Sequence, residues 1–113
     1  MKTISIDFDG TLTDIPEALA LLAASLKSQG HRVIVITRRY ETEENQAEVY
    51  RHIVDNKIAV DRVVFAGPLC KRTAASMVGE SVDIWIDDQP ESITRTMPLP
   101  TAAQARKRSK RQR

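Results

Sequence analysis

The stretch TISIDFDGTLTD, residues 3–14, places two aspartates one residue apart directly after a short apolar run. The apolar and β-branched residues before them predict a strand over residues 3–8. Carboxylates as close as Asp7 and Asp9 repel each other and gain little from burial, so the arrangement costs stability unless a positive charge lies between them. The stretch therefore indicates a strand whose end binds a cation, and phosphate chemistry fits such a site.

Gly10 and Thr11 follow the second aspartate at once. Glycine permits a backbone turn in which a side chain would collide with its surroundings. A threonine hydroxyl locks such a turn by hydrogen bonding to the nearby backbone. We therefore predict a sharp turn directly after Asp9, with Thr11 as the residue that locks it.

The rest of the chain alternates strand and helix patterns. The run RVIVIT, residues 32–37, is apolar and β-branched, which is typical of a strand buried on both faces of a parallel sheet. Further strand patterns cover residues 61–67 and 82–87, and helical patterns cover residues 16–28, 41–57 and 71–78. Strands that alternate with helices form right-handed crossover units. We therefore predict an α/β fold, a Rossmann-like three-layer sandwich with a mainly parallel sheet of about four strands.

Composition limits the class of protein. A chain of 113 residues is long enough for one domain, and 42% hydrophobic with 28% charged residues is an ordinary globular composition. The single cysteine, Cys70, excludes an internal disulfide framework. The N-terminus carries no apolar stretch long enough for a signal peptide or a membrane span. These features favour a cytoplasmic protein that does not contact membranes.

The charges divide the chain into two parts. Residues 1–105 hold all 15 Asp and Glu but only 11 of the 17 Lys and Arg, a net charge of −4. Residues 106–113, RKRSKRQR, hold the other six basic residues and no acid. We expect one folded domain over residues 1–105 and a basic disordered tail over residues 106–113. Such a tail is either solvated or binds phosphates weakly, including those of nucleic acids.

Polar residues gather where the predicted strands end. They are Asp7, Asp9, Thr37, Lys71, Asp87 and Asp88. In a parallel sheet all strands end at the same edge, and ligands bind there at the point where the winding of the chain reverses. If the first and fourth strands are neighbours, four carboxylates converge there with a hydroxyl and an ammonium group. Clustered carboxylate oxygens suit Mg²⁺, which keeps several waters and bridges to substrate phosphate.

The motifs DFDGTLTD, VIVIT, a lysine and WIDDQPE, in this order, resemble the haloacid dehalogenase superfamily of aspartate-nucleophile phosphohydrolases. The likeness spans residues 3–93. It implies that Asp7 attacks phosphorus and forms an aspartyl-phosphate. It implies that Asp9 protonates the leaving oxygen and then deprotonates the hydrolytic water. The Asp7 carboxylate and the Asp9 main-chain carbonyl are then also ligands of Mg²⁺.

The resemblance assigns roles to the other strand ends as well. Thr37 holds the phosphoryl oxygens during transfer, and Lys71 balances the charge of the nucleophile and the phosphate. One of Asp87 and Asp88 reaches the metal directly or through water, and the sequence does not say which. The implied function is a Mg²⁺-dependent phosphomonoester hydrolase acting on a phosphorylated substrate of unknown class.

No cap domain fits in this chain, although the superfamily normally has one. Only about one helix separates Asp14 from Gly30, and only a helix and a strand separate Thr37 from Lys71. We therefore expect an open site, suited to large substrates or to a lid supplied by a second copy in a homo-oligomer.

Two arginines follow Thr37 directly and stand at the rim of the expected site. Arg38 and Arg39 are predicted to bind a second anionic group of the substrate. A merely solvated loop is the alternative for this pair.

Two other functions stay open. A phospho-accepting signalling domain also combines acids, a hydroxyl and a lysine on a parallel sheet, but its acceptor lies on a middle strand and no Asp-Gly-Thr follows the first strand. A nucleic-acid-associated module would use residues 106–113 to hold RNA or DNA, with the acidic site idle or trimming terminal phosphates.

Overall fold

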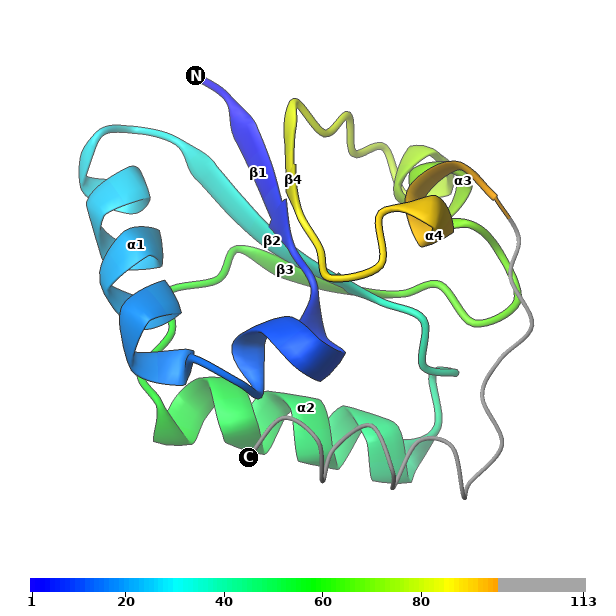
Figure 1. Ribbon diagram of the computed structural model, residues 1–113, viewed down its shortest axis with the longest axis horizontal. Helices are drawn as coiled ribbons and strands as arrows, with labels where there is room; N and C mark the ends of the chain where they lie inside the picture. The colour runs from blue at the N-terminus through cyan, green and yellow to red at the C-terminus, as the bar shows by residue number, and fades with distance from the viewer. Residues whose placement is uncertain (96–113) are drawn as a thin grey trace.

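The computed structural model describes residues 1–95, which form a four-stranded parallel sheet in the order β3-β2-β1-β4 (Figure 1). The strands are β1(Thr3–Ile6), β2(Arg32–Thr37), β3(Arg62–Phe65) and β4(Ile84–Ile86). The predicted α/β fold with a parallel sheet of about four strands is confirmed. The predicted domain boundary at residue 105 and the basic run 106–113 lie outside the described residues.

The helices are η1(Phe8–Leu12), α1(Pro16–Ser28), α2(Glu43–Asp55), α3(Lys71–Met77) and α4(Glu91–Thr94). The bounds of α1 are those predicted. The prediction of 41–57 for the second helix is too long at both ends. Thr42 caps α2, because its side chain accepts a hydrogen bond of 3.1 Å from the Asn45 backbone N–H. After Asp55 the chain leaves the helix and Lys57 adopts a positive φ of 54°.

The strands and α3 are also shorter than predicted. Residues 7 and 8 were predicted as strand, but β1 ends at Ile6 because the chain turns into η1. Of the predicted ranges 61–67, 82–87 and 71–78, only the central parts are regular: β3, β4 and α3. Asp7 therefore stands between β1 and η1 as the N-cap of η1, and Asp9 lies within η1.

Strand β1 is central, since it pairs in parallel with β2 on one side and with β4 on the other. The chain winds from β1 to β2 and β3 and then crosses back to place β4 on the other side of β1. The direction of winding thus reverses between β1 and β4. The pairing extends just past the strand, because the Asp7 backbone N–H donates a hydrogen bond of 2.9 Å to the Ile86 carbonyl. The carboxyl ends of β1 and β4, where the winding reverses, form the edge at which doubly wound folds bind ligands.

Helices cover both faces of the sheet, with α1 and α2 on one side and α3 and α4 on the other (Figure 1). Val33 and Val35 of β2 pack toward α1 and α2, whereas Ile34 and Ile36 pack toward α3. All four side chains have no exposed surface. The continuous apolar pattern of β2 thus reflects burial on both faces, as predicted.

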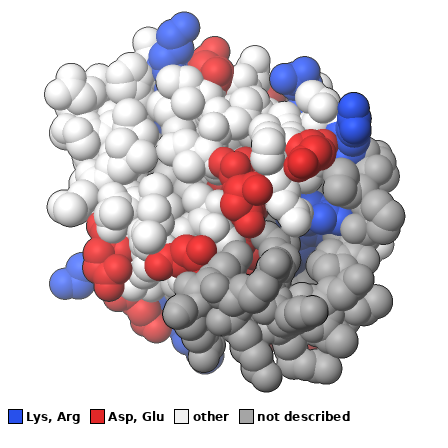
Figure 2. All heavy atoms as spheres, in the orientation of Figure 1, with Lys and Arg blue, Asp and Glu red and all other residues white. Residues whose placement is uncertain are grey.

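The surface of residues 1–95 is acidic on balance, with 15 Asp and Glu against 11 Lys and Arg. In Figure 2, acidic side chains occupy the middle of the face shown and most visible basic side chains lie toward its rim. Between Thr37 and Lys71 the chain forms only α2, β3 and their loops, and the cap-less architecture stays a prediction. None of the helices in residues 1–95 is long and apolar enough to cross a membrane.

Because β2 is buried on both faces, an alanine substitution there is expected to cost more stability than one at an exposed isoleucine. Ile34→Ala removes a fully buried side chain and is expected to lower the free energy of unfolding by about 2 to 5 kcal/mol. Ile84→Ala, on the edge strand β4 where the side chain is 49% exposed, is expected to cost less than about 1 kcal/mol. Urea unfolding of both variants measures the difference. Equal costs would contradict the layered core.

Candidate functional site

A buried lysine joins two carboxylates at the carboxyl edge of the sheet. Asp7 follows β1, Asp87 follows β4, and Lys71 is the first residue of α3. The Lys71 ammonium donates hydrogen bonds of 2.7 Å to Asp7 Oδ1 and 2.5 Å to Asp87 Oδ2. The side chain of Lys71 is only 2% exposed, that of Asp7 is 7% exposed and that of Asp87 is 3% exposed. The structure therefore brings together one residue from each of three predicted motifs.

The remaining hydrogen-bonding capacity of this cluster is also used. Thr11 Oγ1 donates to Asp7 Oδ2 at 3.4 Å, and the Gln89 backbone N–H donates to Asp87 Oδ1 at 2.9 Å. Among the side chains that the structure describes, no buried polar atom lacks a hydrogen-bond partner. Such pairing is the condition under which charged groups are buried at tolerable cost.

Three carboxylates of this cluster have the spacing of metal ligands. Asp7, Asp87 and Asp88 each offer an oxygen, and these oxygens lie within 4.8 Å of one another. The side chains of Asp7 and Asp87 are buried and Asp88 is exposed, so the group is open to solvent on the side of Asp88. Three carboxylate oxygens at an open edge suit a hard divalent cation such as Mg²⁺, which retains waters in its other positions.

The electrostatics of Asp7 fit a cation as well. Burial raises the pKa of the Asp7 carboxyl to about 8, from an ordinary 3.8. The Lys71 charge lowers this pKa, while a hydrogen bond with Asp88 and the negative charge of Asp87 raise it further. The Lys71 ammonium therefore offsets only part of the effect of burial and of the neighbouring carboxylates on the Asp7 pKa. A divalent cation at these oxygens favours the ionised carboxylate.

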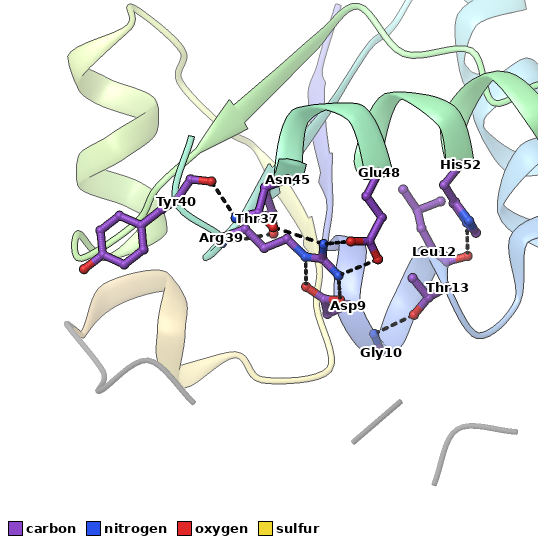
Figure 3. A network of polar contacts seen from close by, with 10 residues as sticks. All are labelled: Asp9, Gly10, Leu12, Thr13, Thr37, Arg39, Tyr40, Asn45, Glu48 and His52. Carbon is purple, nitrogen blue, oxygen red and sulfur yellow. Dashed lines mark hydrogen bonds and ion pairs between the residues drawn. The ribbon is translucent and has the colours of Figure 1, made fainter. Parts of the chain in front are cut away.

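The fourth predicted carboxylate, Asp9, points to a different partner (Figure 3). The Arg39 guanidinium donates to both of its oxygens, from Nε to Oδ2 at 2.9 Å and from Nη2 to Oδ1 at 2.8 Å. The same guanidinium donates from Nη1 to Glu48 Oε2 of α2 at 2.7 Å. It also lies over the Phe8 ring, 5.1 Å from its centre. The Asp9 carboxylate is therefore not in the group of three acids with metal-ligand spacing.

The other predicted residues also lie at this edge. Thr37 ends β2, is 1% exposed, and its Oγ1 accepts a hydrogen bond of 3.3 Å from the Arg39 backbone N–H. Arg38 Nη1 donates to Gln89 Oε1, in the loop after β4, at 3.4 Å. The two arginines thus extend in different directions, Arg39 toward α2 and Arg38 toward the loop that follows Asp87.

Sequence reasoning missed several partners. Glu48 was not foreseen as a partner of Arg39, nor was Asn45, whose Oδ1 accepts from Arg39 Nη1 at 3.4 Å. Thr11 bonds across the turn as expected, through its hydroxyl to Asp7. The part of Thr13 was missed: Gly10 has a φ of 84°, and its backbone N–H donates to Thr13 Oγ1 at 3.0 Å.

Comparison with known proteins identifies no relative of this chain. None of the protein-family models, curated proteins or solved structures compared with the chain matches it. The functional argument therefore rests on the site itself.

The raised pKa of Asp7 predicts a pH-dependent gain in stability on substitution. Folding favours the protonated carboxyl, so the contribution of this group is complete below pH 3.8 and is lost as the pH rises through about 8. Asp7→Asn mimics the protonated form, because its amide both accepts from Lys71 and donates to Asp88. In the presence of a chelator the variant is expected to be more stable than the parent by roughly 1 to 3 kcal/mol above this pKa and by little in acid.

Thermal unfolding across this pH range measures the gain. Asp14→Asn is the matched control, since Asp14 is an exposed acid on the same loop. A gain that does not grow with pH, or that is equal in both variants, would contradict the assigned burial effect.

Proposed function

We propose that the protein is a Mg²⁺-dependent phosphomonoester hydrolase in which Asp7 is the nucleophile. The observation that carries this proposal is the Lys71 ammonium, which lies between Asp7 and Asp87 at the reversal point of the sheet. Asp88 completes a group of three carboxylates there. A carboxylate nucleophile, a fixed cation and a metal-ligand group within one edge are the parts that phosphoryl transfer needs.

In the first step, an Asp7 carboxylate oxygen forms a bond to phosphorus while the bond to the leaving oxygen breaks. The leaving oxygen takes a proton from the Asp9 carboxyl, and an aspartyl-phosphate results. In the second step, Asp9 takes a proton from water as the water oxygen bonds to phosphorus, which releases inorganic phosphate and restores the Asp7 carboxylate. Mg²⁺ held by Asp7, Asp87 and Asp88 supplies positive charge for the phosphoryl oxygens.

Lys71 and Thr37 have supporting roles in this scheme. The Lys71 ammonium neutralises charge on the Asp7 nucleophile before attack and on the phosphoryl oxygens during transfer. It is held from both sides, so it needs no reorganisation when the charge moves. Thr37 ends the neighbouring strand β2, and in this scheme its hydroxyl holds a phosphoryl oxygen.

The order of the four motifs along the chain supports membership of the haloacid dehalogenase superfamily, and this membership is part of the proposal. The nucleic-acid alternative depends on residues 106–113, outside the described part of the chain. The phospho-accepting alternative shares the same acids, so turnover separates it from a hydrolase.

Phosphatase activity is the first test. The purified protein is expected to hydrolyse p-nitrophenyl phosphate only when Mg²⁺ is added, and Asp7→Asn is expected to lower kcat at least about a thousandfold because the nucleophile is lost. Asp14→Asn is expected to retain full activity. Stable phosphorylation of Asp7 without turnover would instead indicate a phospho-accepting domain, and turnover in a chelator would contradict the metal-dependent scheme.

Metal binding is tested separately from turnover. Titration calorimetry with Mg²⁺ and orthovanadate is expected to show one bound ion per chain. Asp88→Asn is expected to weaken that binding about tenfold or more, because it removes one of three carboxylate ligands while leaving the buried Lys71 pairs intact. Unchanged affinity in this variant would exclude Asp88 from the metal site.

A further inference from the structure

The Arg39 guanidinium is bound to Asp9, the carboxyl group that the proposed reaction needs as a general acid. Both oxygens of Asp9 accept hydrogen bonds from it, at 2.8 and 2.9 Å. A general acid must donate a proton toward the leaving oxygen, whereas a carboxylate bound in this forked way only accepts. The observed arrangement is therefore a resting one, and Asp9 has to leave Arg39 before the leaving group departs.

We propose that Arg39 is a latch on Asp9 that an anionic group of the substrate opens, so that the site selects phosphomonoesters carrying a second anionic group. This inference rests on the proposed function. It makes Arg39 a positioning and specificity residue, because it acts on the reaction through Asp9.

The contacts indicate which side of the pair moves. Arg39 keeps its bonds to Glu48 and Asn45 and its position over Phe8 when Asp9 leaves. The guanidinium therefore stays in place, and the short Asp9 side chain rotates. An incoming carboxylate or phosphate restores the forked hydrogen bonds that Asp9 gives up, so the exchange replaces one anion by another at the same cation.

The Arg39–Asp9 ion pair is more exposed to solvent than the Lys71–Asp7 ion pair. The side chains of Arg39 and Asp9 are 21% and 32% exposed, whereas those of Lys71 and Asp7 are 2% and 7% exposed. The Arg39–Asp9 pair is open to water on one side, so an anion in solution can reach the guanidinium and compete for its hydrogen bonds. Breaking a buried pair leaves an uncompensated charge. The same edge thus contains one fixed pair and one exchangeable pair.

The position of the arginines suits a substrate anion. Arg39 lies two residues after the strand end at Thr37, and β2 is the neighbour of β1, which Asp7 follows. Arg39 would therefore lie beside a phosphoryl group bound at Asp7, on the side of the site that faces α2. The second anionic group would extend in that direction from the reacting phosphate.

Arg39 has a simpler alternative role, as a strut between the loop after β2 and helix α2. Glu48→Gln tests this alternative, because it removes the charged contact to α2 and leaves the Asp9 pair. The Glu48 side chain is 58% exposed, so the substitution is expected to be tolerated by the fold.

The experiment compares Mg²⁺-dependent kcat/KM for alkyl phosphates and for carboxyalkyl phosphates of matched chain length. The parent protein is expected to prefer a carboxyalkyl phosphate about tenfold or more, the usual value of a charge-assisted hydrogen bond. Arg39→Gln is expected to bring the two classes within about twofold, by raising activity on alkyl phosphates and lowering it on carboxyalkyl phosphates. Arg39→Lys, which cannot form the fork, is expected to fall between, and Glu48→Gln to keep the preference.

Equal loss on both substrate classes in Arg39→Gln, or loss of the preference in Glu48→Gln, would overturn the latch in favour of the strut. A second readout does not need turnover. The Arg39 Nε–H resonance is expected to shift when a carboxyalkyl phosphonate is added and to stay in place with the matched alkyl phosphonate. Failure to hydrolyse any phosphate ester would contradict the proposed function, and an unmoved resonance would contradict the latch by itself.

Discussion

Lys71 is the residue on which the carboxyl edge of the sheet depends, because its ammonium group lies between carboxylates from two neighbouring strands. Asp7 leaves the end of β1, Asp87 leaves the end of β4, and Lys71 begins α3 on one face of the sheet. Without a cation there, the two carboxylates would repel each other in a poorly solvated place. One ammonium group therefore fastens two strands and a helix at the point where the winding reverses.

The same cluster explains why the edge is suited to chemistry as well as to stability. Three carboxylates share one ammonium group, so the site keeps an excess of negative charge that burial makes costly, and the raised pKa of Asp7 reflects this excess. A second cation lowers the cost. The residues that destabilise this edge are the same ones that we propose as ligands of a divalent ion, which is the usual balance between stability and function at a site.

Asp9 shows the opposite arrangement at a distance of two residues along the chain. It lies in the turn after β1, half-exposed, and it bonds to an arginine that also contacts α2. The buried Lys71 pairs fix the geometry of the edge, whereas the Arg39–Asp9 pair is partly open to solvent. In the proposed function, the buried pairs fix the metal site and the partly exposed pair releases the general acid.

The pattern of the chain alone was sufficient for the architecture. Alternating strand and helix patterns predicted the parallel sheet, the apolar run of β2 predicted burial on both faces, and Pro16 and Gly30 marked the two ends of α1 correctly. Element bounds were less accurate where a turn competes with a strand, as at Asp7, because propensity does not show where the chain bends.

The sequence also placed Asp7, Lys71 and Asp87 at one edge, since parallel strands end together whatever their side chains do. Only the tertiary structure decided how the charges pair. Arg39 and Lys71 are both cations predicted at this acidic edge, yet Lys71 is bound to Asp7 and Asp87 while Arg39 is bound to Asp9 and Glu48. Partner choice depends on the path of each loop and on which helix lies beside it, and neither quantity is encoded in the spacing of residues along one strand.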